Sequence, residues 1–307
     1  MLQLHEPAES VWRHGAFRAG SLMFGQTYED PEIELQAIPC GSRVFCIAGA
    51  GTTAQAISAA GNRVTAVDIS PAQIEYAQAR NAGGPPRDGI AERLLAVGRR
   101  LAPFCGWTRQ KLDHFLNLSC CSEQVAYWDR ELNTAAWRAT VDGLLAPRLL
   151  RLCYRGPFVS ALPAEFGPKF RQRLRRGWAT HSNRDNPFAV LLLTGEPMMC
   201  HHKKALPISF VCADAADFLE RCNPGSFDAF VLSNIGDGVS YEYRRRLAAA
   251  VQDAAAPNAV VVSRSFGEPN AGVGSNLAIK DRSLLWGVVS VCRLGETSEG
   301  GAPCCIC

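Results

Sequence analysis

The sequence predicts an α/β fold in which a Rossmann-like, doubly wound sheet is interrupted by one helical insertion. Three observations support this prediction. Short apolar runs alternate with helix-like segments in both the first and the last third of the chain. The early runs end in glycines or in an acidic residue, where parallel sheets bind their ligands. Residues 87–205 show mainly helical patterns, which are too long for an ordinary crossover between strands.

The first strand–helix–strand unit is the clearest part of the pattern. The apolar run 43–47 ends in a glycine-containing turn and is followed by a helix-like segment. A second apolar run, 64–67, closes with Asp68. Ser70 and Pro71 are then typical of the N-cap and the first position of a helix. This order of elements predicts parallel strands.

The alternation resumes after the insertion. Apolar runs at 208–212 and 227–232 predict two more strands, and each is followed by polar residues. A helix at 241–256, a strand at 259–264 and a last strand or strand pair at 284–294 complete the pattern. We therefore assign two parts to the chain: residues 1–84 with 206–307 form a Rossmann-like domain, and 85–205 form a helical insert.

Composition and charge exclude several classes of protein. Apolar residues make up 47% of the 307 residues and charged residues 20%, as in folded globular proteins. The net charge of +3 is too small to indicate nucleic-acid binding, and no apolar run is long enough to span a membrane. The thirteen cysteines are irregularly spread, which favours free thiols in a reducing compartment. The N-terminus lacks the apolar stretch of a signal peptide, so we expect a cytoplasmic protein.

No metal site is predicted. The cysteines near the C-terminus, Cys304, Cys305 and Cys307, would need a fourth ligand and are too close together for tetrahedral geometry. The run from His201 to Lys204 is most simply an exposed loop.

Residues that follow the predicted strands are the candidate site, because parallel sheets bind ligands beyond the carboxyl ends of their strands. Gly49 and Gly51 follow the first strand, but the third glycine of a dinucleotide motif is absent. This favours a mononucleoside ligand such as S-adenosylmethionine, with its ribose on Asp68 and its adenine on Asp214. We expect the cofactor to contact Gln26, Ala48, Gly49, Gly51, Asp68, Ile69, Gln73, Asp214, Ala215, Ser233 and Asn234.

Several short motifs, in order along the chain, carry a family resemblance. They are 28–31 (Tyr-Glu-Asp-Pro), 48–51, 67–73, 127–129, 185–188, 232–235, 262–264 and 281–283. Over most of its length the chain resembles the diacylglycerol 3-amino-3-carboxypropyl transferases of betaine-lipid synthesis. It departs from them at Tyr28, where the family often has tryptophan, and at Thr52 and Thr53, where it often has Cys-Asn.

The resemblance implies an S-adenosylmethionine-dependent transferase of a particular kind. The γ-carbon of the methionine chain, rather than the methyl group, is transferred, and methylthioadenosine leaves. The acceptor it implies is the hydroxyl of a diacylglycerol-like lipid, held in an acceptor pocket that the insert 85–205 forms as it roofs the cofactor-binding domain. Such an acceptor is compatible with peripheral contact at a membrane surface. Tyr28 is expected to pack on the cofactor, and Glu29 or Asp30 to touch the methionine amino group or the acceptor.

Three alternatives stay open. The same γ-carbon chemistry could act on a soluble small molecule or cyclise the methionine chain internally. An ordinary methyltransferase could use the same fold, and a non-enzymatic nucleoside-binding protein would bind without turnover. The sequence does not predict the oligomeric state.

A hydroxyl acceptor needs a general base. Candidate bases are Glu29, Asp30, His114, Asp129 and Asp237. Arg264, after the fifth strand, is either a partner for the methionine carboxylate or a structural residue.

In the predicted helix 166–178, Phe166, Phe170, Leu174 and Trp178 form an apolar stripe flanked by Lys169, Arg171, Arg173, Arg175 and Arg176. This pattern fits either an interfacial helix on anionic lipid or a core-facing stripe with a solvated basic face.

Overall fold

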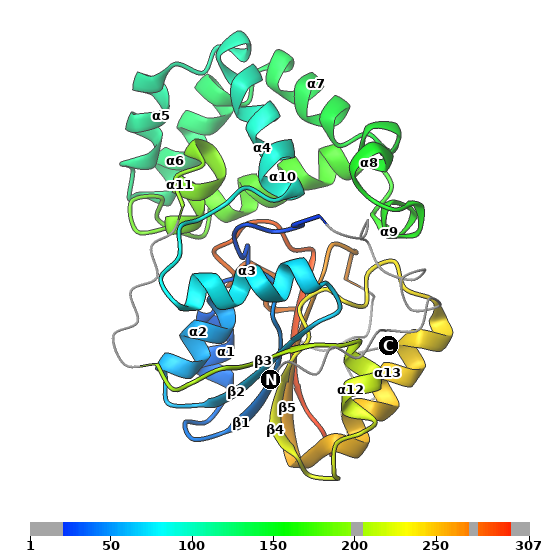
Figure 1. Ribbon diagram of the computed structural model, residues 1–307. Helices are drawn as coiled ribbons and strands as arrows, with labels where there is room; N and C mark the ends of the chain where they lie inside the picture. Colours follow the sequence, from blue (N-terminus) through cyan, green and yellow to red (C-terminus); the bar gives the residue numbers. More distant parts are fainter. Residues whose placement is uncertain (1–20, 198–204, 270–275, 296–307) are drawn as a thin grey trace.

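The centre of the molecule is a six-stranded sheet with the order β3-β2-β1-β4-β5-β6 (Figure 1). The computed structural model describes residues 21–197, 205–269 and 276–295. The strands are β1 (Arg43–Ile47), β2 (Arg63–Asp68), β3 (Ser209–Cys212), β4 (Phe227–Val231), β5 (Ala255–Ser265) and β6 (Val288–Arg293). Strands β1 to β5 are parallel to their neighbours, and β6 is antiparallel to β5. The predicted α/β fold with a mostly parallel sheet is confirmed, and the sheet is compatible with a Rossmann-like fold.

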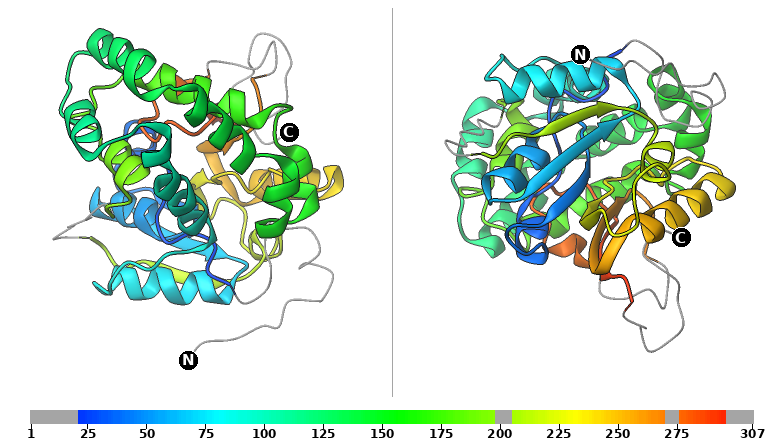
Figure 2. Two further views of the ribbon diagram at one scale, coloured as in Figure 1. Left: turned by 90° about the horizontal axis from the view of Figure 1, so that it is seen from above. Right: turned by 60° about the horizontal axis from the view of Figure 1, so that its bottom comes forward.

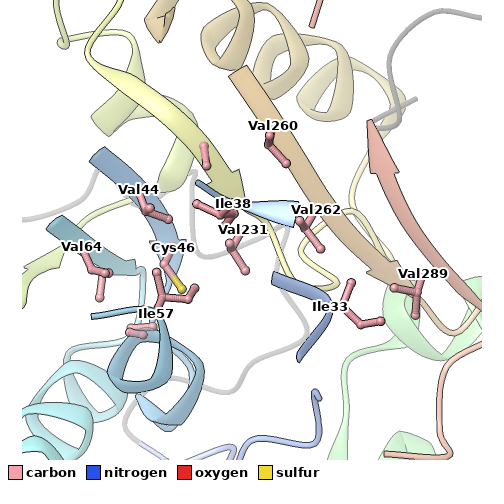
Figure 3. Close-up of a cluster of buried hydrophobic side chains, with 14 of the residues drawn as sticks. Ile33, Ile38, Val44, Cys46, Ile57, Val64, Val231, Val260, Val262 and Val289 are labelled. Atoms are coloured by element: carbon pink, nitrogen blue, oxygen red, sulfur yellow. The ribbon is translucent and has the colours of Figure 1, made fainter. Parts of the chain in front are cut away.

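Helices cover both faces of this sheet. Helices α1 (Glu32–Ala37), α2 (Thr52–Ala59) and α3 (Pro71–Asn81) supply side chains to one core, and α12 (Ala215–Leu219) and α13 (Tyr241–Ala254) to the other. Alternate residues of the strands serve opposite faces, since Val44 and Cys46 enter the first core and Phe45 the second. Figure 3 shows the first core, where valines of five strands, β1, β2, β4, β5 and β6, meet isoleucines of α1 and α2.

Local sequence signals set the start of the helices that follow β1 and β2. Gly51 is the N-cap of α2 in a left-handed conformation (φ 89°), which glycine adopts without strain. Ser70 is the N-cap of α3, where its hydroxyl accepts a hydrogen bond from the Gln73 amide, and Pro71 follows. Both helices therefore begin where the sequence predicts.

In the described residues between α3 and β3, every regular element is a helix. They are α4 (Ile90–Leu101), η2 (Ala102–Cys105), α5 (Arg109–Leu116), α6 (Cys121–Tyr127), η3 (Trp128–Leu132), α7 (Ala135–Leu144), α8 (Pro147–Cys153), α9 (Gly156–Ala161), α10 (Phe166–Trp178) and α11 (Pro187–Thr194). A short helix, η4 (Leu277–Ile279), precedes β6. The helices α4 to α11 lie together above the sheet and form their own core (Figures 1 and 2).

The insert is joined to the rest of the chain by close packing and by α10. The side chain of Arg173 is buried and donates hydrogen bonds to the carbonyls of Phe266, Gly267 and Leu285. A Cβ at Gly177 would come within 2.1 Å of the Leu284 side chain, so α10 and Leu284 pack closely at this glycine. Tyr28, assigned from the sequence to the sheet domain, packs in the core of the insert.

Helix α10 is not an interfacial helix. Leu174 and Trp178 are buried in the core of the insert, and the stripe faces inward. The basic residues have partners within the protein as well: Lys169 and Arg173 lie against Glu268, Arg171 binds Asp142, Arg175 binds Asp129, and Arg176 donates to the Trp286 carbonyl. The alternative of a core-facing stripe holds, because helical periodicity reports an apolar face without identifying what covers it.

The remaining sequence-based expectations concern thiols and membrane spans. The nine cysteines within the described ranges are all free, as predicted. Among the helices of those ranges, none combines the length and the apolar character that crossing a bilayer requires. The run from His201 to Lys204 and the cysteines Cys304, Cys305 and Cys307 lie outside the described residues.

Candidate active site

A cavity of about 580 Å³ lies between the carboxyl ends of the parallel strands and the helical insert. Its floor is polar and includes Glu29, Gly49, Ala50, Asp68, Ile69, Asp214, Ser233, Asn234 and Asp237. Its upper part, here called the apolar chamber, is lined by Leu94, Leu95, Val141, Leu145, Leu150, Phe158, Leu162, Phe166, Phe170, Leu174, Leu192 and Leu193. The floor lies at the end of β1, which has β2 on one side and β4 on the other. Parallel sheets of this kind usually bind their ligands at this point, where the strand order reverses direction.

The glycine loop after β1 borders the floor through its first glycine only. Gly49 has φ 49°, and a Cβ added there would meet no atom within 4 Å. Because Gly49 lines the cavity, a side chain at this position would take up space that a ligand needs. Gly51 does not line the cavity, so its predicted contact with the cofactor is not seen there. Its role is structural: it starts α2 in a left-handed conformation and lies close to Ala77.

Asp68 lies at the end of β2 with both carboxylate oxygens held by backbone amides. Oδ2 accepts from Gly49 N at 3.3 Å and Oδ1 accepts from Ser70 N at 2.9 Å. Burial raises the pKa of Asp68 to about 6, although the hydrogen bonds from these amides oppose the rise. Each oxygen keeps a second lone pair for a donor in the cavity, so the side chain is well placed for a diol.

Gln73 does not face the cavity. Its Nε2 donates to the carbonyls of Phe24 (2.8 Å) and Gly49 (2.7 Å), and its Oε1 accepts from the amides of Met23 and Phe24. All of its polar atoms are thus used to fix the segment before α1 onto the glycine loop. Gln73 therefore positions this segment, in place of the predicted contact with the cofactor. The sequence did not indicate this role, because Phe24 lies 49 residues away from Gln73.

Glu29 lies on the floor next to Ser233, which follows β4. Ser233 Oγ donates to Glu29 Oε1, and Thr53 Oγ1 donates to Oε2 at 3.4 Å. Ser233 has φ 52°, an unusual conformation for a residue other than glycine, and such positions concentrate at functional sites. Glu29, which precedes α1, and Ser233, which follows β4, both line the cavity, so two residues that the sequence assigned to the site lie together in it.

Asp30, the neighbour of Glu29, points elsewhere. Its carboxylate pairs with Arg282 (Nε to Oδ2, 2.6 Å; Nη2 to Oδ1, 2.7 Å) and accepts the Glu32 amide. Asp30 is buried and does not line the cavity. This geometry argues for a structural role in holding the segment that carries Glu29, and against Asp30 as the general base.

Arg264 is the centre of a buried ion-pair network. Its guanidinium binds Glu34, which is fully buried, and Asp281 at 3.0 Å, and donates to the Asp30 carbonyl. Glu29 Oε2 lies 3.7 Å from Arg264 Nη1. The structural alternative for Arg264 therefore holds: its partners are carboxylates of the protein, and it does not line the cavity.

Asp214 lies after β3, on the opposite side of the floor. Its Oδ1 caps α12 by accepting from the Asp217 amide at 3.0 Å, and its Oδ2 accepts from Tyr243 Oη at 2.6 Å. Burial and the Asp214 carboxylate raise the pKa of Tyr243, so this tyrosine stays protonated and a donor. The cavity is also lined by five other residues for which the sequence predicts cofactor contacts: Gln26, Ala48, Ile69, Ala215 and Asn234.

Asp237 lies where the polar floor meets the apolar chamber. It accepts from Asn234 Nδ2 (3.3 Å) on the floor, and from Ser265 Oγ (2.6 Å) and the Phe266 amide (3.0 Å). The ring of Phe266 packs against Phe166 and other aromatic rings of the chamber wall. Burial raises the pKa of Asp237. Among the candidate bases Glu29 and Asp237 line the cavity, whereas His114 stacks on Tyr127 and Asp129 binds Arg175 away from it.

The chamber also contains donors that have no acceptor among the described residues. Thr27 Oγ1, Tyr28 Oη and Trp137 Nε1 are buried, line the cavity and make no hydrogen bond there. An unsatisfied buried donor costs about 1–3 kcal/mol, so a ligand with oxygen acceptors in the chamber would relieve this cost. The sequence predicted that the insert supplies an acceptor pocket, but it did not predict which residues line it, because the walls come from many helices of the insert.

The comparisons with known proteins add no identification. No protein family, no curated protein and no solved structure shows a significant match to this chain. Function therefore rests on the chemistry of the cavity and on the sequence resemblance.

The polar groups of the floor suit S-adenosylmethionine. Five carboxylates line the cavity, and two guanidinium groups, those of Arg99 and Arg246, do so as well. The carboxylates are those of Glu29, Asp68, Asp214, Asp237 and Glu242. Their excess over the cations suits a ligand with a sulfonium and an ammonium group. Asp68 has free lone pairs for a ribose diol, and the open space at Gly49 gives room beside the backbone.

Proposed function

We propose that this protein transfers the 3-amino-3-carboxypropyl group of S-adenosylmethionine to an oxygen of a diacylglycerol-like lipid. One observation carries the proposal: the acidic floor at the strand ends continues directly into a large apolar chamber. A cationic nucleoside substrate and an acyl-chain acceptor would each find the matching surface within one cavity. The choice of the γ-carbon rests on the sequence resemblance.

In this proposal the floor holds and orients the nucleoside substrate. Asp68 accepts from the ribose hydroxyls, Asp214 and Asn234 lie toward the base, and Glu29 binds the methionine ammonium group. Ser233 and Thr53 fix the Glu29 carboxylate for this purpose. S-Adenosylmethionine supplies an electrophilic γ-carbon next to a good leaving group. Which of its three carbons reacts depends on alignment with the acceptor oxygen.

Asp237 is proposed to take the proton from the acceptor. Asp237 lies at the boundary between the polar floor and the apolar chamber. If the acyl chains of the acceptor fill the chamber, its hydroxyl lies at this boundary. The oxygen forms a bond to the γ-carbon, the carbon–sulfur bond breaks with its electron pair moving to sulfur, and methylthioadenosine leaves. The hydroxyl proton passes to the Asp237 carboxylate.

Product analysis tests this proposal. The protein is incubated with S-adenosylmethionine, with and without diacylglycerol vesicles, and the nucleoside product is identified by mass spectrometry. We expect methylthioadenosine that depends on the vesicles. S-Adenosylhomocysteine would instead establish methyl transfer, and methylthioadenosine that forms equally without vesicles would establish a soluble acceptor or internal cyclisation.

The raised pKa of Asp68 predicts a pH dependence of substrate binding. Ribose hydroxyls donate to the ionised carboxylate, whose pKa in the free protein is about 6. As the pH falls below this value, the proton must leave before binding, so the dissociation constant should rise about tenfold per pH unit. Isothermal titration of S-adenosylmethionine between pH 5 and 7.5, values that bracket this pKa, measures the effect.

Asp68→Asn provides the matching variant. It should weaken binding about 10- to 100-fold at pH 7.5, since hydrogen bonds to a charged group contribute about 1.5–3 kcal/mol. It should also remove the pH dependence. Asp228→Asn, at an exposed ion pair with Arg43, is the control and should bind as the wild type does. An Asp68→Asn variant with wild-type affinity and pH profile would show that the ribose lies elsewhere.

A further inference from the structure

Helix α8 presents an apolar and basic outer surface, although its inner side belongs to the cavity. Leu150 on α8 is buried and lines the apolar chamber, as does Phe158 on α9. On the outer side Leu149 and Leu152 are 37% and 66% exposed. The two helices therefore form a thin wall with the chamber behind it and exposed leucines in front.

Two arginines accompany these leucines without an ion-pair partner. Arg148 and Arg151 are exposed, and neither forms an ion pair with any residue that the structure describes. The chain contains no Asp or Glu between Asp142 and Glu165. This distinguishes α8 from α10, whose cationic side chains bind carboxylates or carbonyls of the protein.

The position of α8 suits a surface that meets a partner. Figure 1 shows α8 and α9 at the side of the insert, above the carboxyl ends of the strands. Their buried residues Leu150, Phe158 and Val159 form a small cluster separate from the main core of the insert. The outer face of α8 is thus left open within the described part of the chain.

We propose that this outer face, made of Arg148, Leu149, Arg151 and Leu152, binds the surface of an anionic lipid bilayer. Exposed leucines enter the headgroup region of a bilayer, and unpaired arginines are attracted to anionic headgroups. Charge complementarity selects this partner over a neutral membrane. The inference rests on the proposed function only in that a lipid acceptor would then enter the chamber from the bilayer side of the α8–α9 wall.

Vesicle flotation tests the proposal without turnover. The full chain is mixed with vesicles of phosphatidylcholine alone, or with added phosphatidylglycerol, and the bound fraction is measured. The wild type should bind the anionic vesicles and not the neutral ones. Arg148→Glu with Arg151→Glu, and separately Leu149→Ser with Leu152→Ser, should each weaken this binding by at least about tenfold.

Matched variants separate this surface from general effects. Arg63→Glu with Arg221→Glu carries the same charge change at exposed positions at the other end of the sheet, and Ile279→Ser changes an exposed apolar residue elsewhere. Both controls should bind anionic vesicles as the wild type does. All variants should bind S-adenosylmethionine equally, because no changed residue lines the cavity.

Several outcomes would overturn the proposal. They are a wild type that does not bind anionic vesicles, α8 variants that bind normally, and a charge control that is equally impaired. A dimer that the leucine variants dissociate, seen by light scattering, would assign the surface to a second copy of the chain. Failure of the proposed function looks different: binding to vesicles would still depend on α8, while no methylthioadenosine would form.

Discussion

Replacing Asp237 with asparagine should lower kcat for the transfer about 10²- to 10⁴-fold, the usual contribution of a general base. The carboxylate lies between Asn234 on the floor and the Phe266 amide of the chamber wall, where the acceptor hydroxyl is expected. The dissociation constant of S-adenosylmethionine should change little, since Asp237 is not proposed to hold it. Steady-state kinetics and titration of the same variant measure both effects.

The pH profile gives a second test of Asp237. Burial raises its pKa, while the Ser265 hydroxyl opposes this by donating to the ionised form. A base must be deprotonated, so kcat should rise with pH through this raised pKa. Ser265→Ala removes the opposing hydrogen bond and should move the acid limb to higher pH while turnover is kept. Wild-type kcat in Asp237→Asn would exclude it as the base and leave Glu29 as the predicted base that lines the cavity.

The largest effect on stability is expected at Arg264. Arg264→Met would leave Glu34 and Asp281 buried without their cation, and breaking such a pair costs about 3–5 kcal/mol. Burial raises the pKa of Glu34 while Arg264 lowers it, so the variant should also bind a proton more readily there. Chemical denaturation of wild type and variant measures the change in the free energy of unfolding.

A matched control and a rescue sharpen this test. Arg43→Met breaks an exposed ion pair with Asp228, which solvent screens, so it should cost far less than Arg264→Met. Adding Glu34→Leu to Arg264→Met should recover part of the loss, since one stranded carboxylate is removed. If Arg264→Met were no more costly than Arg43→Met, the network would not hold the segment that carries Glu29.

The geometry of parallel sheets explains which residues of the site could be predicted from the sequence. Carboxyl ends of parallel strands meet at one edge, so Asp68, Asp214 and Ser233 could be placed together although they are far apart in the chain. The same logic predicted Asn234 and Gly49. Strand ends and helix caps are local signals, and single residues such as Ser70 carry them.

The errors arose where tertiary partners decide the role of a side chain. Gln73, in the first turn of α3, binds the backbone of Phe24 and does not line the cavity. Asp30 is held by Arg282, 252 residues away. The stripe on α10 packs inward, whereas the exposed face of α8 is too short for periodicity to reveal. None of these contacts has a signature in the local sequence.

The central claim is that the aminocarboxypropyl chain, and not the methyl group, moves from the floor of the cavity into a lipid. Two samples of S-adenosylmethionine, one labelled in the carboxyl carbon and one in the methyl carbon, test it directly. After incubation with diacylglycerol vesicles, we expect the carboxyl label to enter the lipid phase and the methyl label to stay with the soluble nucleoside. Methyl label in the lipid phase, or carboxyl label that remains wholly soluble, would contradict it.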